Sequence, residues 1–99
     1  MLYVITGTDS PDGLERRKRA RPAHLERAHR LVEEGRMAIA GPCPAIDSSD
    51  PGPAGFSGSV IIAEFGSLED ARAWIAADPY VTEGVFESWD VRPFVRVLP

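Results

Sequence analysis

The feature that most constrains the fold is the alternation of strand-like and helix-like segments along a chain of only 99 residues. The segments "LYVITG" (2–7) and "GSVIIAEF" (58–65) combine β-branched and aromatic residues and are bounded by glycine, which is typical of strands. Between them a basic helical segment begins at about Leu14. Pro22 is expected to start or kink the main helix, which ends at Gly35.

The second half of the chain repeats this alternation. The segment "MAIAG" (37–41) predicts a short strand before 58–65. Ser67 is placed to cap a second helix that ends near "ADPY" (77–80), where a proline disfavours helical backbone at the residue before it. The segment "VFESWDVRPFVRVL" (85–98) predicts a long final strand, which Pro93 confines to a sheet edge or to a bulge. The apolar face of the second helix consists of Leu68, Ala71, Trp74 and Ile75.

This order of segments indicates the α+β class. Strand, helix, strand, strand, helix, strand is the order of two split βαβ units, which pack as a four-stranded antiparallel sheet with both helices on one face, the ferredoxin-like arrangement. We expect one domain over residues 1–99, because so short a chain supports one core. The stretch 42–57 holds four prolines and two glycines and is expected to be an irregular loop, a length that is uncommon unless the loop has a function.

Alternation in two predicted strands leaves apolar residues on both faces of the sheet. In 58–65, one face carries Ile61, Ala63 and Phe65 and the other carries Val60 and Ile62. In 85–98, one face carries Trp89, Val91, Val95 and Val97 and the other carries Phe86, Phe94 and Leu98. An antiparallel sheet covered on one face usually presents polar residues on the other. The second apolar face therefore predicts an interface, most simply between two copies in a symmetric homodimer.

Composition argues against several classes of function. The formal net charge of −4 disfavours nucleic-acid binding, and the one basic run, "ERRKRARP" (15–22), contains no aromatic residue to stack a base. No apolar run reaches the roughly 18 residues of a transmembrane helix, and the apolar start lacks the basic region of a signal peptide. A single cysteine, Cys43, forms no internal disulfide, which fits a reducing compartment. We expect a cytoplasmic protein without nucleic-acid or membrane partners.

Two histidines stand five residues apart in "RARPAHLERAHRL" (19–31). At about 100° per residue, His24 falls inside the apolar arc of the helix and His29 just beyond its edge. His24 is either a core-edge histidine bonded to a backbone carbonyl or a general base, which needs an orienting carboxylate. Asp78 is the best candidate for that carboxylate, and its alternative role is to cap the turn in which it lies.

Other chemistries have less support in the sequence. The spacing of the histidines does not place both on one helical face, and no Cys/His cluster accompanies them, so we expect neither a metal nor another cofactor. Cys43 stands between two prolines without a basic neighbour to stabilise a thiolate, which indicates an inert thiol.

Five short motifs in order resemble the YciI-like family of the dimeric α+β barrel superfamily: "RPAH" (21–24), "AGPCPAIDS" (40–48), "GFSGS" (55–59), "ADPY" (77–80) and "VRPF" (91–94). The resemblance covers nearly the whole chain and implies a ferredoxin-like protomer that pairs into a dimeric α+β barrel. It also implies an active pair, a histidine from the first motif and an aspartate from the fourth. In this sequence these residues are His24 and Asp78.

The resulting expectation is a cofactor-free enzyme of isomerase or lyase (dehydrohalogenase-like) type acting on a small cyclic or aromatic substrate. His24 accepts a proton, and Asp78 holds the imidazole tautomer. The expected pocket lies between the helices and the sheet, with the loop 42–57 and Arg21, Ser57, Ser59 and Tyr80 as its walls. The alternatives are a solvated Arg21 and, for the whole protein, a non-catalytic dimeric ligand-binding or assembly module whose His–Asp pair is structural.

Overall fold

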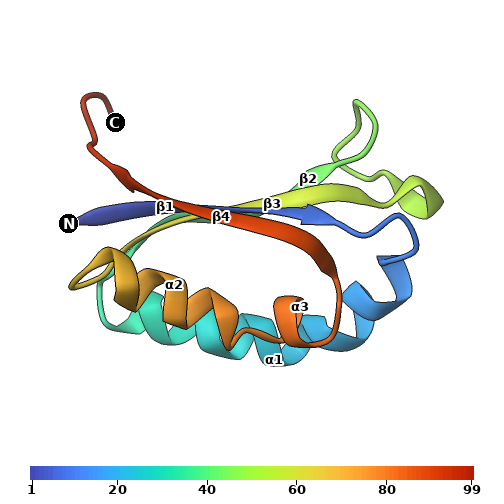
Figure 1. The fold of residues 1–99 in the computed structure, drawn as a ribbon. Helices are drawn as coiled ribbons and strands as arrows, with labels where there is room; N and C mark the ends of the chain where they lie inside the picture. The colour runs from blue at the N-terminus through green and yellow to red at the C-terminus, as the bar shows by residue number, and fades with distance from the viewer.

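A computed structural model describes residues 1–99 and has the predicted α+β, ferredoxin-like fold. Its four strands form one sheet in the order β2-β3-β1-β4, with every neighbouring pair antiparallel. Figure 1 shows all the α-helices on one side of this sheet. The elements are β1 (Leu2–Asp9), α1 (Leu14–Glu33), β2 (Met37–Pro44), the 3₁₀ turn η1 (Gly52–Ala54), β3 (Phe56–Glu64), α2 (Leu68–Ala76), α3 (Pro79–Thr82) and β4 (Phe86–Phe94).

The prolines of the sheet lie in its two edge strands. Pro93 pairs with Tyr3 in β4, which confirms the predicted edge position. The expected loop 42–57 is shorter than predicted, because β2 continues to Pro44 on the other edge and pairs Pro42 with Ser59. An edge strand bonds on one side only, so a proline whose missing N–H would face solvent does not interrupt it.

The prediction that Pro22 starts or kinks the main helix was wrong about the start, because α1 runs unbroken from Leu14 through this residue. Pro22 is exposed, and the helix is held to the sheet on both sides of it by buried residues, Arg17 and Ala20 before it and His24 after it. This packing offsets the lost hydrogen bond. No helix in the structure has both the length and the apolar character to cross a membrane.

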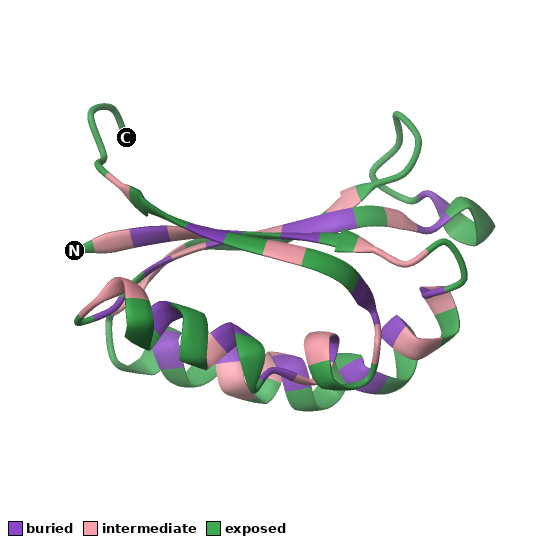
Figure 2. Cartoon of the chain, in the orientation of Figure 1, coloured by how far each residue is buried: buried purple, intermediate pink, exposed green.

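The core lies between the helices and one face of the sheet (Figure 2). Ile61, Ala63 and Phe65, which the sequence placed together on one face, all lie in this core. The prediction that Phe86 opposes Val91 was wrong, since both side chains lie in this core. A register shift at Thr8/Asp9 inserts an extra residue into β4 and reverses the alternation beyond it. The Phe86 ring takes the space of a side chain at Gly7, where an added Cβ would lie 2.4 Å from it.

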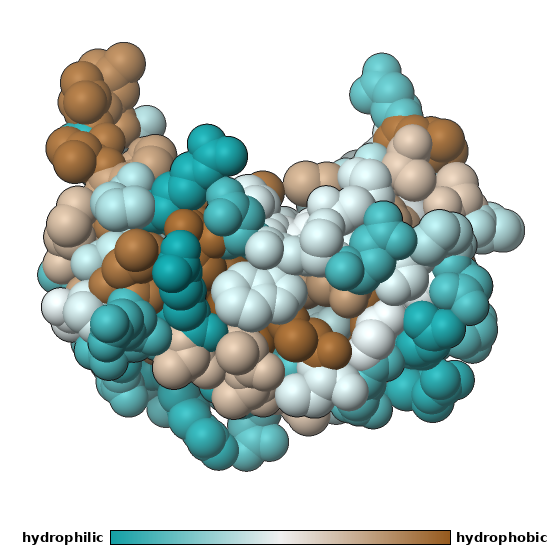
Figure 3. Space-filling model, in the orientation of Figure 1, coloured by the Kyte–Doolittle hydropathy of each residue, from teal (hydrophilic) through white to brown (hydrophobic).

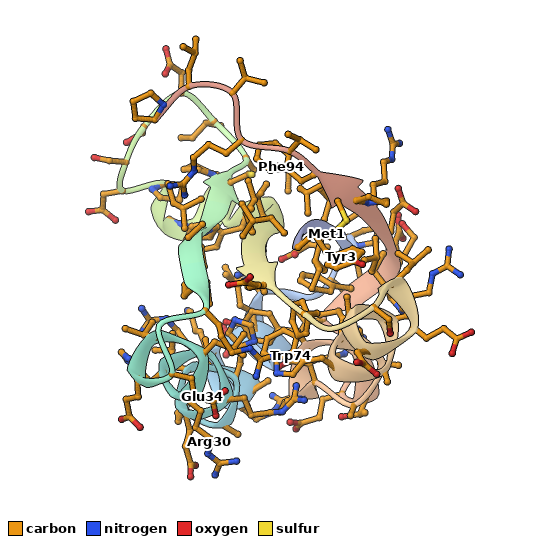
Figure 4. The ribbon with its side chains drawn as sticks, turned by 90° about the vertical axis from the view of Figure 1, so that its left-hand side faces the viewer. Met1, Tyr3, Arg30, Glu34, Trp74 and Phe94 are labelled. Carbon is orange, nitrogen blue, oxygen red and sulfur yellow. The ribbon has the colours of Figure 1, made fainter.

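The opposite face of the sheet is open and partly apolar. Val4 and Ile62 pair across β1 and β3 on this face, and Figure 4 places Phe94 on the other side of the sheet from Trp74. The last strand ends at Phe94 rather than continuing to Leu98 as predicted. Figure 3 shows hydrophobic surface on both projecting ends, the C-terminal tail and the loop after β2. The exposed apolar residues there are Val95, Val97, Leu98 and Ile46.

Candidate active site

The carboxylate of Asp78 is positioned by the turn between α2 and α3. Pro79 follows it, and the backbone of Asp78 is extended, which ends α2 and makes Asp78 the N-cap of α3. Asp78 Oδ2 accepts a hydrogen bond from the Tyr80 amide at 3.0 Å. Because α3 packs against α1, this turn holds the carboxylate against the middle of α1.

His24 and Asp78 are buried and form a cluster with the half-buried Arg27. His24 Nδ1 lies 2.8 Å from Asp78 Oδ2, and Arg27 Nη1 donates to Asp78 Oδ1 at 2.7 Å. Arg27 also donates to the carbonyl oxygen of Trp74 at 2.9 Å, and its guanidinium lies 4.6 Å from the centre of the Trp74 ring. The structure therefore brings together the histidine and the aspartate that the sequence suggested, and the aspartate also caps a turn.

Asp78 is ionised in this cluster although its side chain is fully buried. Burial raises the pKa of its carboxyl, but the hydrogen bond and charge of His24, the Tyr80 amide and the Arg27 guanidinium outweigh that effect and lower the pKa below 3.8. An ionised carboxylate only accepts hydrogen bonds, so His24 Nδ1 carries the proton in this contact.

The other ring nitrogen of His24 is free. The imidazole stacks on Tyr80 with ring centres 3.8 Å apart and planes 9° apart, which fixes its orientation. Nε2 has no hydrogen-bond partner within the chain, and no fully buried polar side-chain atom lacks one. Nε2 is therefore open to the hollow that His24 lines.

That hollow has a volume of about 200 Å³ and lies between α1 and the β2–β3 side of the sheet. The predicted wall residues Arg21, Ser59 and Tyr80 line it. Ser57 does not, and its exposed hydroxyl donates to the Cys43 carbonyl oxygen at 3.3 Å. The register shift between β2 and β3 leaves Ser57 as an extra residue in β3, which breaks the alternation that would have placed it beside Ser59.

Burial raises the pKa of the Tyr80 phenol, and the charges of Arg17 and Arg21 oppose that rise without cancelling it. The phenol therefore stays protonated at neutral pH. Arg21 itself is exposed and forms no ion pair or hydrogen bond through its side chain. It is thus an uncompensated cation at the edge of the hollow.

The sequence analysis missed Arg17, which is the most buried of the charged residues that line the hollow. Arg17 is 4% exposed, and its guanidinium holds Asp9 through two bonds, Nε to Oδ2 at 2.9 Å and Nη2 to Oδ1 at 2.7 Å. Nη2 also donates to Ser59 Oγ at 3.0 Å. The rings of Phe56 and Tyr80 lie 5.0 and 4.9 Å from the guanidinium carbon.

The sequence analysis missed Arg27 as well as Arg17, although the positions of both along the helix could have indicated them. Arg17 precedes His24 by seven residues, or about two turns, and so lies on the same face, but a helix that starts at Pro22 excludes it. Arg27 follows His24 by three residues at the edge of the polar arc. Its long side chain turns inward so that only the guanidinium reaches Asp78.

No group of three or more His, Cys, Asp or Glu side chains gathers in the structure in a way that could hold a metal ion. His29 is exposed on α1, away from the cluster around His24. Cys43 is half-buried with a free thiol.

Comparisons with known proteins agree with the fold and identify the family. The chain is 59% identical to protein YciI of Escherichia coli O6:H1 over 99% of this chain and 100% of that protein. It is 38% identical to derivative of benzaldehyde biosynthesis cluster protein C of Emericella nidulans, over 83% of this chain and 85% of that protein.

Among solved structures, 5-chloro-2-hydroxyhydroquinone dehydrochlorinase (TftG) from Burkholderia phenoliruptrix AC1100, in complex with 2,5-dihydroxybenzoquinone, superposes with a TM-score of 0.83. The match covers 96% of this chain and 94% of that one at 24% identity, and so concerns the fold alone. The model of the YCII-related domain matches residues 1–95. On the evidence of this match and of its identity to YciI, the chain belongs to the family of YCII-related domain proteins.

Proposed function

We propose that this protein is a cofactor-free enzyme that moves a proton at His24 Nε2. The observation that carries the proposal is the free Nε2, which opens to a hollow while Nδ1 is held at 2.8 Å by an ionised, buried carboxylate. A positioned base of this kind contributes about 10²–10⁴-fold in rate.

Each member of the cluster has a distinct role in this proposal. Asp78 accepts the Nδ1 proton, so it fixes the tautomer in which Nε2 is the base and stabilises the imidazolium that forms. Arg27 and the Tyr80 amide hold the carboxylate in place. Tyr80 fixes the plane of the imidazole by stacking. The same groups are in position to return the proton as a general acid.

The size of the hollow favours a single substituted ring as substrate. A cavity of about 150 Å³ binds benzene, and this hollow measures about 200 Å³. The names of two similar proteins, a 5-chloro-2-hydroxyhydroquinone dehydrochlorinase and a protein of a benzaldehyde-derivative biosynthesis cluster, also refer to compounds with a single ring. The favoured reactions are isomerisation, in which His24 removes a proton and returns it at another position, and elimination. In elimination, His24 removes a proton from carbon, and the electrons of the broken C–H bond form a double bond. The halide leaves with the electrons of the carbon–halogen bond.

A structural role for the pair is the alternative, and one observation favours it. Asp78 caps α3 and joins α1 to the end of α2 through Arg27, so its replacement disturbs the fold as well as any chemistry. Substitution of Asp78 therefore does not separate the two functions. Substitution of His24 does, because the imidazole has only one hydrogen bond within the chain.

The test compares His24→Gln with the matched control His29→Gln, which changes the exposed histidine of the same helix. Halide release from 5-chloro-2-hydroxyhydroquinone and hydrogen exchange at ring carbons of cyclic ketones serve as probes. We expect His24→Gln to lower the proton-transfer rate by about 10²–10⁴-fold and His29→Gln to leave it unchanged. Equal rates in all three proteins, or no proton transfer by the parent on any probe, would contradict the proposal.

We also propose that the protein is a homodimer that buries the open face of its sheet. Val4, Ile62 and Phe94 lie on this face, and an apolar sheet face of this kind is stable when a second sheet covers it. Ile62→Glu should dissociate the dimer to monomers in light scattering, whereas Glu33→Gln on the exposed end of α1 should not. A parent protein with monomer mass at micromolar concentration would contradict this part.

A further inference from the structure

A second hollow adjoins the one at His24. It has a volume of about 280 Å³ and lies over the first turns of α1, beside the loop that follows β2. Arg17, Arg21 and Pro42 line both hollows, so the two meet along this line of residues. A ligand can therefore extend from one hollow into the other.

The second hollow is basic although the chain as a whole is acidic. Arg17, Lys18 and Arg21 line it against one carboxylate, that of Asp50. Arg17 is balanced by Asp9 at 2.7 Å, and Lys18 lies 3.4 Å from Glu15 on the exposed side of α1. Arg21 has no acidic partner, so the uncompensated charge lies where the two hollows meet.

The buried Arg17 guanidinium is held rigidly at this junction. Nε and Nη2 make all of its hydrogen bonds, to Asp9, Gly58 and Ser59. Nη1 makes none of these bonds, and the Tyr80 phenol, which lines the first hollow with Arg17, interacts with this side chain. A guanidinium held rigidly by a carboxylate at the wall of a hollow is a pre-organised cation for an anionic oxygen.

We propose that the substrate is a cyclic compound with a carboxylate-bearing side chain, bound with its ring beside His24 and its carboxylate at Arg21 and the neighbouring Arg17. This inference rests on the proposed function, since it takes the first hollow as the reaction site. It adds the substrate class and two residues that determine specificity. The second hollow receives the side chain, and Phe56 and Pro51 give it apolar walls.

The test measures binding rather than turnover. Phenylacetate and its neutral analogue phenylacetamide are titrated into the intact protein by calorimetry at low salt. We expect phenylacetate to bind at least about tenfold more tightly, because charge-assisted hydrogen bonds to a carboxylate are stronger than those to an amide, and we expect the preference to fall with added salt.

Substitutions test which residues produce the preference for phenylacetate over phenylacetamide. Arg21→Gln should remove most of the advantage of phenylacetate and leave the affinity for phenylacetamide unchanged, and Lys18→Gln should reduce it less. The matched control Arg30→Gln, on the exposed side of the same helix, should change neither affinity. Equal affinities of the parent for the two compounds, no binding of either, or a preference that survives Arg21→Gln would overturn the inference.

His24→Gln separates this inference from the proposed function. The variant should retain the preference for phenylacetate, because Arg17 and Arg21 remain, while it loses proton transfer. A variant that keeps the preference alongside unimpaired proton transfer contradicts the proposed function alone. If the parent is inactive on every probe while Arg21→Gln removes the preference for phenylacetate, that result supports the anion site as a binding site and contradicts the proposed enzyme function.

Discussion

Two buried carboxylates face the same helix, and they differ in what holds them. The side chains of Asp9 and Asp78 are 4% and 0% exposed, and each accepts a hydrogen bond from an arginine at 2.7 Å. Asp9 is paired with Arg17 alone among charged groups, through two parallel bonds. Asp78 divides its oxygens between an arginine and His24.

Because of this difference, the partner of Asp9 is permanently charged, whereas one partner of Asp78 can gain or lose a proton. Arginine keeps its proton at every physiological pH, so the Asp9–Arg17 pair can hold an anion in place but cannot exchange a proton. An imidazole can both accept and donate a proton, so the centre formed by His24 and Asp78 can exchange one. Arg17 and His24 are two helical turns apart on one face of α1 and line the same hollow, so the two proposed functions concern adjoining hollows.

The largest effect on the free energy of unfolding is expected from breaking the Asp9–Arg17 pair. Arg17→Met leaves Asp9 charged and buried without a partner, which should cost about 3–5 kcal/mol in the free energy of unfolding. Urea denaturation measures this loss. The double variant Arg17→Met/Asp9→Asn should recover much of the stability, because the unpaired charge is gone. A double variant as unstable as the single one would show that packing, rather than charge, sets the cost.

Breaking the cluster around Asp78 should lower the free energy of unfolding by a smaller amount. Asp78→Asn retains an oxygen that can accept the Tyr80 amide but loses the charge-assisted bonds to His24 and Arg27, and we expect a loss of about 2–4 kcal/mol. The same urea denaturation compares it with Arg17→Met. A loss greater than that of Arg17→Met would reverse the comparison and assign the main structural role to the His24–Asp78 cluster.

Acid should withdraw the stabilisation that Asp78 provides. The pKa of Asp78 is lower in the folded protein than its ordinary value of 3.8, so folding favours its ionised form. The contribution is fully present above about pH 5 and is lost as the pH falls through the folded pKa. The stability difference between the parent and Asp78→Asn should therefore shrink below pH 3.8. Asp47→Asn, which removes an exposed carboxylate in the loop after β2, serves as the control. A difference that stays constant through this range would contradict the lowered pKa.

The smallest stability effect is expected at His24 itself. His24→Gln removes one hydrogen bond within the chain and one stacking contact, which should cost about 1 kcal/mol. Denaturation and light scattering on the same sample measure stability and assembly together. A cost of several kcal/mol, or dissociation of the proposed dimer, would favour the structural role of the pair.

The order of elements was predictable because hydrophobic periodicity is local, and the edge position of Pro93 followed from its missing N–H. The errors arose where tertiary contacts override local rules. Packing on both sides of Pro22 carries α1 through it, and an extra residue in β4 turns Phe86 into the core. An extra residue in β3 likewise removes Ser57 from the hollow.

The candidate site was predictable only in part, for the same reason. His24 lay on the apolar arc, but the approach of Asp78 depends on how α3 packs against α1, which no local pattern encodes. Arg17 was missed because the apolar arc was defined by apolar residues alone. A buried arginine lies on that arc only because Asp9, at the end of the preceding strand, pairs with it.

The central claim is that Asp78, unlike Asp9, is coupled to a group that exchanges protons. The most direct test follows the Asp78 carboxyl carbon by NMR during an acid titration of the parent and of His24→Gln. The account predicts a pKa for Asp78 below 3.8 in the parent, and a higher pKa in the variant, because the hydrogen bond and charge of His24 are the largest of the effects that lower it. An unchanged Asp78 titration would contradict the account, because the imidazole would then be a neighbour of the carboxylate without being coupled to it.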